Sequence, residues 1–504
     1  SDEVLINVVQ TLERILDVSH EKLMALLSGT KKSSVVVKIA DEISRKAMFS
    51  ILEQRPNLPG VTITSEPMRH YPYHAWGSHM LGHLGEISQQ ELSTRSVDGY
   101  KQGDIIGKSG IESVYDYYLK GKPGGMQLEV DATGRSQRIL YDIPSIPGNN
   151  VVLNIDRYIQ DAAETMFRKS NFAGAAVAID PWSGKVLALV SSPNYDPNLF
   201  LKPLDPETKQ ELFFSEENFM FNRALSGQYA LGSVFKIIPV IAGMETGSPL
   251  IHETVRCKGK FKLGRQEFKC WKKHGVVDLL EAVTHSCNVY FYQLGLSATL
   301  TPLVKYSRLF GLGEENGIDL PGEKSGLMPD AGWKKKNMKE IWYDGDTVNL
   351  SIGQGFLLVT PLQAACLAAA VASRGKLYRA YLLDKITNPN GDVMVSGKHH
   401  LIRHIHLSTE CWDMLDRSLV NVVEAGTGRA CRIPGLIIAG KTGTVQNPHG
   451  LDHAWFVAYA SLPDEKPRIA CAVLVEHGEH GSTAAAPIAR EMIRAAFPEI
   501  EHVR

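Results

Sequence analysis

The sequence has no excess of charge of either sign. Its 54 lysines and arginines are balanced by 55 aspartates and glutamates, so the formal net charge is -1. No basic run is longer than a few residues. Because a nucleic-acid-binding protein needs a basic face to neutralise phosphates, this balance argues against nucleic acid as a partner.

Long uninterrupted hydrophobic segments are missing as well. Residues 1–25 alternate apolar and charged groups in the manner of an amphipathic helix. The longest uncharged stretch, residues 347–373, is long enough to span a bilayer, but it contains Asn349, Gln354 and Pro361. We therefore expect this stretch to be a buried core helix and not a membrane span.

Cysteine is scarce and odd in number. The chain has seven cysteines in 504 residues, which excludes the disulfide framework of a small secreted domain. Four side chains are nevertheless closely spaced, as Cys257-x12-Cys270-x3-His274-x12-Cys287. Three thiols and an imidazole suit a closed, tetrahedral structural zinc site. Two alternatives stay open, namely buried free cysteines that act as small hydrophobic groups and a Cys257–Cys270 disulfide that closes the loop.

What the sequence does contain is three short motifs in a fixed order, 233–236 (Ser-Val-Phe-Lys), 286–288 (Ser-Cys-Asn) and 441–444 (Lys-Thr-Gly-Thr). If the first motif is helical, its hydroxyl and amine lie three residues apart on one face. The second motif adds a hydroxyl and an amide, and the third adds a cation on a strand-like edge. Together these groups suit acyl transfer from an amide. The candidate catalytic residues are Ser233, Lys236, Ser286, Asn288, Lys441, Thr442, Gly443 and Thr444.

The apolar stretch 237–244 after the first motif is typical of a buried helix. Burial removes solvation from Lys236, which favours the neutral amine, and a neutral amine can accept the proton of Ser233. Pro239 is expected in the second turn of this helix, where it would remove one backbone hydrogen bond and kink the helix. Pro239 removes no reacting group, so we expect at most an effect on the acylation rate.

In order and residue content the three motifs resemble those of the penicillin-binding proteins, serine acyltransferases of bacterial cell-wall synthesis. Residues 175–190 resemble the first hairpin of their transpeptidase domain, and 351–355 followed by Thr360-Pro361 is similar to another hallmark of the family. Thr360 and Pro361 are also expected as the N-cap and the first position of a helix. Residues 103–112 resemble the non-catalytic pedestal of class B members, most closely the penicillin-binding protein 2 branch, which works in cell elongation.

The resemblance implies an α+β multidomain protein with the penicillin-binding, or transpeptidase, fold. This fold has a central antiparallel sheet flanked by helices and an all-helical subdomain, and class B members add an extended N-terminal pedestal. We expect the pedestal head at 1–68, the pedestal body (a penicillin-binding protein dimerisation-type domain) at 69–155 and the transpeptidase domain at 156–504. The length of 504 residues and the 44% hydrophobic content are compatible with several domains and a large core.

The resemblance also assigns roles to the first two motifs. Ser233 would attack the carbonyl carbon of a D-Ala-D-Ala stem peptide, and Lys236 would take its proton. Ser286 would relay the proton to the leaving D-Ala nitrogen. A second stem peptide's amine would then attack the acyl-enzyme and give a cross-link, and β-lactams would acylate Ser233 as substrate mimics. No cofactor is required for this chemistry.

The remaining roles concern substrate binding. Asn288 would hold the substrate amide, while Lys441, Thr442 and Thr444 would bind the terminal carboxylate. The oxyanion would lie between the backbone N–H groups of Ser233 and Thr444, where preorganised donors stabilise the developing charge.

Partners and location follow from the resemblance alone. The sequence has no glycosyltransferase segment, so a RodA-type glycosyltransferase and MreC are the expected partners. Members of the family are normally tethered by one amino-terminal helix, and this chain begins Ser-Asp-Glu without an initiator Met. We therefore expect it to be part of a longer protein anchored in the inner membrane, with the catalytic domain in the periplasm.

Three other functions are alternatives to cross-linking. A β-lactam-hydrolysing enzyme would need a carboxylate that activates a deacylating water, and no Glu-x-x-Leu-Asn-like motif lies between the second and third motifs. A catalytically limited penicillin-binding sensor or scaffold would keep the fold without needing all three motifs. A D,D-carboxypeptidase would use the same acyl-enzyme with water as the acceptor.

Overall fold

The structure is a computed structural model that describes residues 2–28, 37, 39–40, 43–63, 68–95, 100–122, 125–130, 136–447 and 450–502. The chain folds into two compact units. One comprises Ser1–Arg69 and Lys120–Gly148, and the other comprises His70–Leu119 and Asn149–Arg504.

The first unit combines short helices with a hairpin. Its helices are α1 (Asp2–Leu16), α2 (His20–Ser28) and α3 (Arg45–Glu53), and its hairpin strands are β3 (Gly125–Val130) and β4 (Ser136–Ile143). Val9, Leu12 and Leu23 are in its small apolar core. The amphipathic pattern over 1–25 forms two helices and not one, because Asp17 adopts a left-handed φ of 54° directly after α1.

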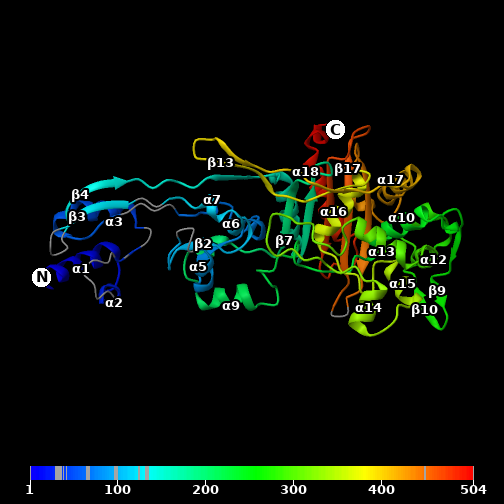
Figure 1. The fold of residues 1–504 in the computed structure, drawn as a ribbon, viewed down its shortest axis with the longest axis horizontal. Coiled ribbons are helices and arrows are strands. Elements are labelled where there is room, and N and C mark those ends of the chain that lie inside the picture. Colours follow the sequence, from blue (N-terminus) through cyan, green and yellow to red (C-terminus); the bar gives the residue numbers. More distant parts are fainter. Residues whose placement is uncertain are drawn as a thin grey trace. The chain divides into compact units, whose positions relative to one another are not determined.

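A five-stranded antiparallel sheet forms the centre of the second unit, in the order β16-β17-β18-β6-β7 (Figure 1). The strands are β6 (Gly174–Ile179), β7 (Val186–Ser192), β16 (Ile437–Val445), β17 (His453–Ser461) and β18 (Ile469–Val475). The predicted hairpin over 175–190 is confirmed as β6 and β7. β16, which carries the third motif, is an edge strand of this sheet.

Helices cover both faces of the sheet. Side chains alternate along a strand, so Ala176 and Ala178 belong to the apolar cluster that contains residues of α8 (Arg157–Ser170) and α18 (Ala485–Ala496), whereas Ala175 and Val177 belong to the cluster that contains residues of α16 (Pro361–Ala372) and α17 (Thr409–Glu424). The predicted antiparallel sheet flanked by helices is therefore confirmed. Thr360 also caps α16 as predicted, since its hydroxyl accepts the backbone N–H of Gln363 at 3.2 Å.

A helical subdomain holds the first two motifs. It contains η4 (Gly232–Lys236), α10 (Ile237–Glu245), α11 (Leu279–Thr284), α12 (Asn288–Ala298), α13 (Leu300–Leu309), α14 (Ala331–Met338) and α15 (Asp344–Leu350). The prediction of one core helix over 347–373 is wrong. The stretch is divided between the end of α15, a loop and α16, because Gly353 and Gly355 adopt positive φ angles that end a helix.

Two small hairpins join α10 to α11. β8 (Val255–Cys257) pairs with β11 (Gly275–Val277), and between them β9 (Lys260–Leu263) pairs with β10 (Gln266–Lys269). In Figure 1 β9 and β10 are drawn beside α12 and α15. This segment carries Cys257, Cys270 and His274, and the second motif follows it after α11.

The other elements of the second unit are peripheral. They are α4 (Ser78–Leu81), β1 (Leu84–Glu86), α5 (Gln89–Arg95), β2 (Ile105–Gly107), α6 (Gly110–Val114), α7 (Asp116–Leu119), β5 (Asn150–Leu153), η3 (Pro197–Leu201), α9 (Pro206–Phe214), η5 (Pro249–Ile251), β12 (Lys376–Tyr378), β13 (Leu383–Thr387), β14 (Val393–Ser396), β15 (Leu401–His404), η6 (Arg429–Cys431) and η7 (Pro498–His502). Among all the residues that the structure describes, no helix combines the length and the apolar character needed to cross a bilayer.

Candidate active site

Ser233 lies in η4, a short 3-10 helix, where it is half-buried. A 3-10 helix eclipses residues i and i+3, so Ser233 and Lys236 share one face, as the motif predicts. The turn before Ser233 is tight: Gly232 has a φ of 58° and donates its N–H to the Gly353 carbonyl at 2.8 Å. A Cβ at Gly353 would lie 2.2 Å from the carbonyl oxygen of Gly232, so this contact requires glycine.

The disturbance of the helix that was predicted at Pro239 does not occur. α10 begins only at Ile237, because the motif itself is 3-10, and Pro239 is therefore the third residue of α10. The backbone N–H groups of a first turn have no partner within an α-helix. The missing N–H of Pro239 consequently costs little, and the predicted loss of a hydrogen bond in the second turn is wrong.

Lys236 is almost fully buried, with 1% of its surface exposed. Its Nζ donates to three acceptors: Asn288 Oδ1 at 2.7 Å, the Ser286 carbonyl at 2.9 Å and Ser286 Oγ at 3.1 Å. Burial lowers the pKa of Lys236 to about 7, although the neighbouring thiols Cys270 and Cys287 act in the opposite direction. The amine thus changes charge near neutral pH, as a general base for a serine requires.

The hydroxyl of Ser286 accepts hydrogen bonds from two lysines. Lys441 Nζ donates to Ser286 Oγ at 3.0 Å, the same atom that accepts from Lys236 Nζ. Lys441 has no exposed surface. Its burial, and to a smaller extent the repulsion from Lys236, holds the pKa of Lys441 well below the usual range. Two amines of lowered pKa around one hydroxyl make a path along which a proton can move.

The backbone of Ser286 is strained. It links α11 to α12 with a left-handed φ of 55°, a conformation that a residue with a Cβ adopts at a cost of about 1–2 kcal/mol. A glycine is usual at such a helix end. The presence of a serine at this position, in place of a glycine, indicates that the serine hydroxyl is needed there.

This strain gives a prediction that separates backbone from side chain. Ser286→Gly and Ser286→Ala both remove the hydroxyl, so both are expected to lose cross-linking. Only glycine relieves the left-handed backbone, so Ser286→Gly should be more stable to unfolding than Ser286→Ala by about 1 kcal/mol. Denaturant unfolding of the two variants measures the difference, and equal stabilities would show that the Ser286 backbone carries no strain.

The third motif lies on β16, next to η4. Thr442 Oγ1 is hydrogen-bonded to Thr427 Oγ1 at 2.6 Å. A Cβ at Gly443 would lie 2.9 Å from the Trp455 Cβ and 3.0 Å from the Leu231 carbonyl oxygen. Gly443 therefore lets the strand approach the serine helix closely. Half-buried Thr444 follows it.

The structure brings all eight candidate residues into one site. Lys236, Ser286, Asn288 and Lys441 are joined by direct hydrogen bonds. Ser233 Oγ has no hydrogen bond to any residue that the structure describes, and catalytic hydrogen bonds of this kind often form only when substrate is bound.

The sequence did not predict the supporting roles of three residues of the site. Thr427, the partner of Thr442, lies in the segment Gly426-Thr427-Gly428 after α17, a turn-like pattern that could have drawn attention. Trp455 donates its indole N–H to the Ala230 carbonyl at 3.0 Å and supports the serine turn. Gly353 was noted only as part of a family hallmark.

The four predicted metal ligands form a second cluster beside the site. The ligand atoms of Cys257, Cys270, His274 and Cys287 all lie within 4.8 Å of one another. His274 Nδ1 is 3.6 Å from Cys257 Sγ and 3.5 Å from Cys270 Sγ. A tetrahedral zinc with bonds of about 2.0–2.3 Å separates its ligand atoms by about 3.3–3.8 Å, so both distances from His274 suit such an ion, and three thiols with one imidazole are a ligand set that zinc prefers.

The cluster is connected to the second motif. Cys270 Sγ accepts the backbone N–H of Asn288 at 3.3 Å, and Cys287 lies between Ser286 and Asn288. A hydrogen bond from Cys287 lowers the pKa of Cys270 to about 4, and the same contact raises the pKa of Cys287. All seven cysteines are free thiols, so the predicted alternative of a Cys257–Cys270 disulfide is not what the structure contains.

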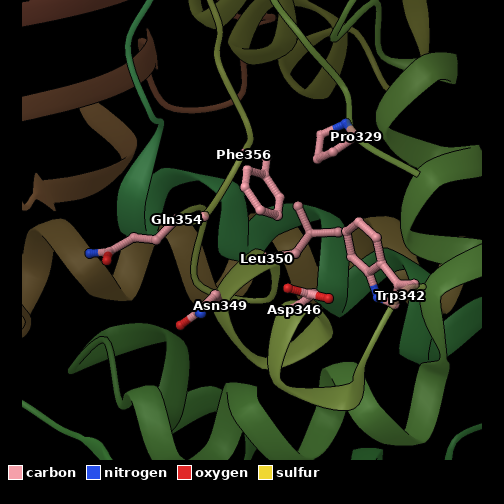
Figure 2. A pocket seen from close by; sticks show the side chains of 8 residues that line it. Pro329, Trp342, Asp346, Asn349, Leu350, Gln354 and Phe356 are labelled. Atoms are coloured by element: carbon pink, nitrogen blue, oxygen red, sulfur yellow. The ribbon is translucent and has the colours of Figure 1, made fainter. Parts of the chain in front are cut away.

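A small cavity lies between α15 and the loop that follows it, and none of the eight candidate catalytic residues lines it (Figure 2). Its volume is about 60 Å³, which is room for a few water molecules and far too little for a stem peptide. Asp346 is a charged residue in its wall, and its carboxylate accepts a hydrogen bond from Lys334 Nζ at 2.7 Å. The cavity is not a substrate site. Its lining consists of Pro329, Trp342, Asp346, Asn349, Leu350, Gln354, Gly355 and Phe356.

A serine and a lysine on one short helix, a second hydroxyl between two lysines and an edge strand beside them define a penicillin-interacting serine acyltransferase. Two family models match the chain. The penicillin binding protein transpeptidase domain covers residues 174–494, and the penicillin-binding protein dimerisation domain covers residues 1–153.

Individual relatives agree with the family models. The peptidoglycan D,D-transpeptidase MrdA of Acinetobacter baumannii is 33% identical over 95% of this chain and 74% of its own length. The crystal structure of Pseudomonas aeruginosa PBP2 in complex with WCK 5153 is 34% identical, with a TM-score of 0.72 over 85% of this chain and 90% of that one. PBP2 in its complex with MreC from Helicobacter pylori is 28% identical, with a TM-score of 0.82 over 99% of this chain and 92% of that one.

The chain belongs to the class B penicillin-binding proteins, in the PBP2 branch. It is a peptidoglycan D,D-transpeptidase of cell elongation. Acyl transfer on a serine needs no cofactor.

Proposed function

We propose that cross-linking proceeds through an acyl-enzyme on Ser233, with the proton carried by Lys236, Ser286 and Lys441. The observation that supports this most directly is the convergence of Lys236 Nζ and Lys441 Nζ on Ser286 Oγ, at 3.1 and 3.0 Å. Neutral Lys236 takes the proton of Ser233 as the hydroxyl attacks the carbonyl carbon of the D-Ala-D-Ala bond. Ser286 then passes a proton to the leaving D-Ala nitrogen.

The other residues of the site hold the substrate. Asn288 binds the substrate amide, while Lys441, Thr442 and Thr444 bind the terminal carboxylate. Gly443 keeps β16 close to η4, and the backbone N–H groups of Ser233 and Thr444 stabilise the oxyanion. A second stem peptide's amine completes the reaction by attacking the acyl-enzyme. β-Lactams acylate the same serine.

We further propose that Cys257, Cys270, His274 and Cys287 hold a structural zinc. Four protein ligands leave no open position, so the ion supplies stability and no chemistry on the substrate. The contacts of these residues show what a bound ion would stabilise. Cys270 fixes the start of α12 through the Asn288 N–H, and Cys287 separates the two functional residues of the second motif. Holding these cysteines in place therefore holds Ser286 and Asn288.

The cellular setting is also a proposal. We propose that MreC is a partner, on the basis of the Helicobacter pylori complex, and that a RodA-type glycosyltransferase supplies the strands. We also propose that the catalytic domain lies in the periplasm and that the protein is anchored in the inner membrane. We also propose three domains, namely a pedestal head at 1–68, a pedestal body at 69–155 and a transpeptidase domain at 156–504.

The function is tested by a reconstituted cross-linking reaction. The chain is mixed with lipid-linked peptidoglycan precursor and a partner glycosyltransferase, and the products are digested and separated. Cross-linked dimers are expected, and pretreatment with benzylpenicillin should abolish them.

Two outcomes of this reaction would contradict the proposal. Stem peptides that lose D-Ala without forming dimers would indicate a D,D-carboxypeptidase. Acylation by penicillin without any turnover of the precursor would indicate a sensor or scaffold.

A further inference from the structure

A strongly basic surface borders the active site, although the chain as a whole is nearly neutral. Residues 256–273 contain eight lysines and arginines and a single acidic residue, Glu267. All eight basic side chains are exposed. We call this surface the basic hairpin, and its basic residues are Arg256, Lys258, Lys260, Lys262, Arg265, Lys269, Lys272 and Lys273. Since the net charge is -1, the rest of the chain is acidic, so this positive surface is local.

Three of the lysines in the basic hairpin lie on one outer face of β9 and β10. Phe261 and Phe268 point inward, where both rings pack near Tyr292. The alternating side chains of β9 and β10 therefore turn Lys260, Lys262 and Lys269 toward solvent.

Two of these lysines face each other. Lys260 lies directly opposite Lys269 in the antiparallel register, and like charges in opposite positions destabilise a strand pair.

The protein itself neutralises little of this charge. Within the part of the chain that the structure describes, Lys260 is the only one of the eight that forms an ion pair, with Glu267 at 2.8 Å. The hydrogen bond from Lys260, with further influence from Lys262 and Lys269, lowers the pKa of Glu267. Uncompensated charge that opposes the pairing of its own strands indicates an anionic ligand outside the chain.

The basic hairpin is continuous with the catalytic groups. The Lys269 carbonyl accepts a hydrogen bond from Asn288 Nδ2 at 3.4 Å. Two residues later, the indole N–H of Trp271 lies 3.3 Å from the carbonyl oxygen of Ser286. An anion bound along the outer face would thus be held beside the second motif.

We propose that the basic hairpin binds the carboxylate-bearing peptidoglycan strand that supplies the acceptor amine. This inference rests on the proposed function, because it is the cross-linking reaction that requires a second strand. Uncross-linked stem peptides end in carboxylates and repeat along a glycan, so they present a row of negative charges to a row of lysines. The contact would raise the local concentration of acceptor at the acyl-enzyme and favour cross-linking over hydrolysis.

The test measures strand binding after the donor pocket has been filled. The full chain is acylated with benzylpenicillin, and its affinity for soluble, uncross-linked glycan strands carrying pentapeptides is measured at low and high salt. The variant Lys260→Glu/Lys262→Glu should weaken binding by about tenfold or more, and the wild-type affinity should fall as salt rises. The control Lys209→Glu/Lys398→Glu makes the same change in net charge at exposed lysines elsewhere and should bind as the wild type does.

Penicillin acylation separates this inference from the proposed function. An unchanged acylation rate shows that the hairpin variant is folded and has an intact Ser233, whereas a wild type that is never acylated would refute the catalytic proposal and not the binding one. Equal strand affinities in the hairpin variant and the control would overturn the inference. It would also be overturned if the substitutions reduced binding only to vesicles containing anionic phospholipid, which would make this a membrane-contacting surface.

Discussion

Lys236→Met is expected to slow acylation of Ser233 by benzylpenicillin by a factor of about 10³. At its ordinary pKa of about 10.4 only about one lysine in a few thousand is neutral at pH 7, whereas a pKa of about 7 makes about half of them neutral. Methionine keeps the buried stem but has no basic nitrogen. Stopped-flow or gel-based labelling with a fluorescent penicillin measures the rate, and Ser233→Ala sets the background.

The same cause predicts the pH dependence. Burial lowers the pKa of Lys236, so the proton-accepting form is present above about pH 7 and is lost as pH falls below it. The wild-type acylation rate should therefore rise about tenfold between pH 6 and pH 8.

Lys236→Arg provides the matched control for this dependence. It keeps a cation in place that does not lose its proton in this range, so it should be as slow as Lys236→Met. An arginine variant that acylates at the wild-type rate would show that Lys236 acts as a charge and not as a base.

The second large effect is expected at the cysteine cluster. Protein purified without added metal should contain about one zinc per chain, and Cys270→Ser should contain none. Loss of the ion should lower the thermal unfolding midpoint by about 5–10 °C, because β8, the connection between β10 and β11, and the second motif are no longer held together. Acylation should also slow, since Cys270 anchors the Asn288 N–H.

Cys366→Ala is the control for this experiment. Cys366 is buried in α16 and is not one of the four clustered ligands, so its replacement should leave the zinc content unchanged. Elemental analysis and thermal unfolding of the three proteins decide the question. A metal-free wild type would end the proposal, and the cluster would then be a set of packed thiols.

Much of the site was accessible from local sequence. The spacing of Ser233 and Lys236 placed the two groups on one face, and the apolar stretch after them predicted the burial that lowers the lysine pKa. Thr360 and Pro361 marked the start of α16 because capping depends on a few adjacent residues. The cysteine spacing was enough to select four residues that the fold brings together.

The errors arose where one local conformation depends on another. Pro239 was predicted to break a hydrogen bond because the preceding motif was assumed to be α-helical, and a 3-10 turn moves the start of α10. Residues 347–373 were predicted as one helix from their composition. Composition does not show that the backbone turns at Gly353, whose carbonyl accepts the Gly232 N–H. The second error comes from a contact between segments far apart in the sequence.

By itself, the sequence determined which chemical groups are present and how neighbouring ones are arranged, because helix periodicity, capping and burial depend on nearby residues. It therefore yielded the serine, the two lysines and the cysteines. Only the tertiary structure decided that Lys236 and Lys441, 205 positions apart in the chain, both donate to Ser286 Oγ, that Thr427 supports Thr442, and that eight basic residues share an exposed surface beside the second motif. The first two arrangements depend on the packing of β16 against other elements, and the third depends on the fold of the segment between α10 and α11. Spacing along the chain carries no information about either.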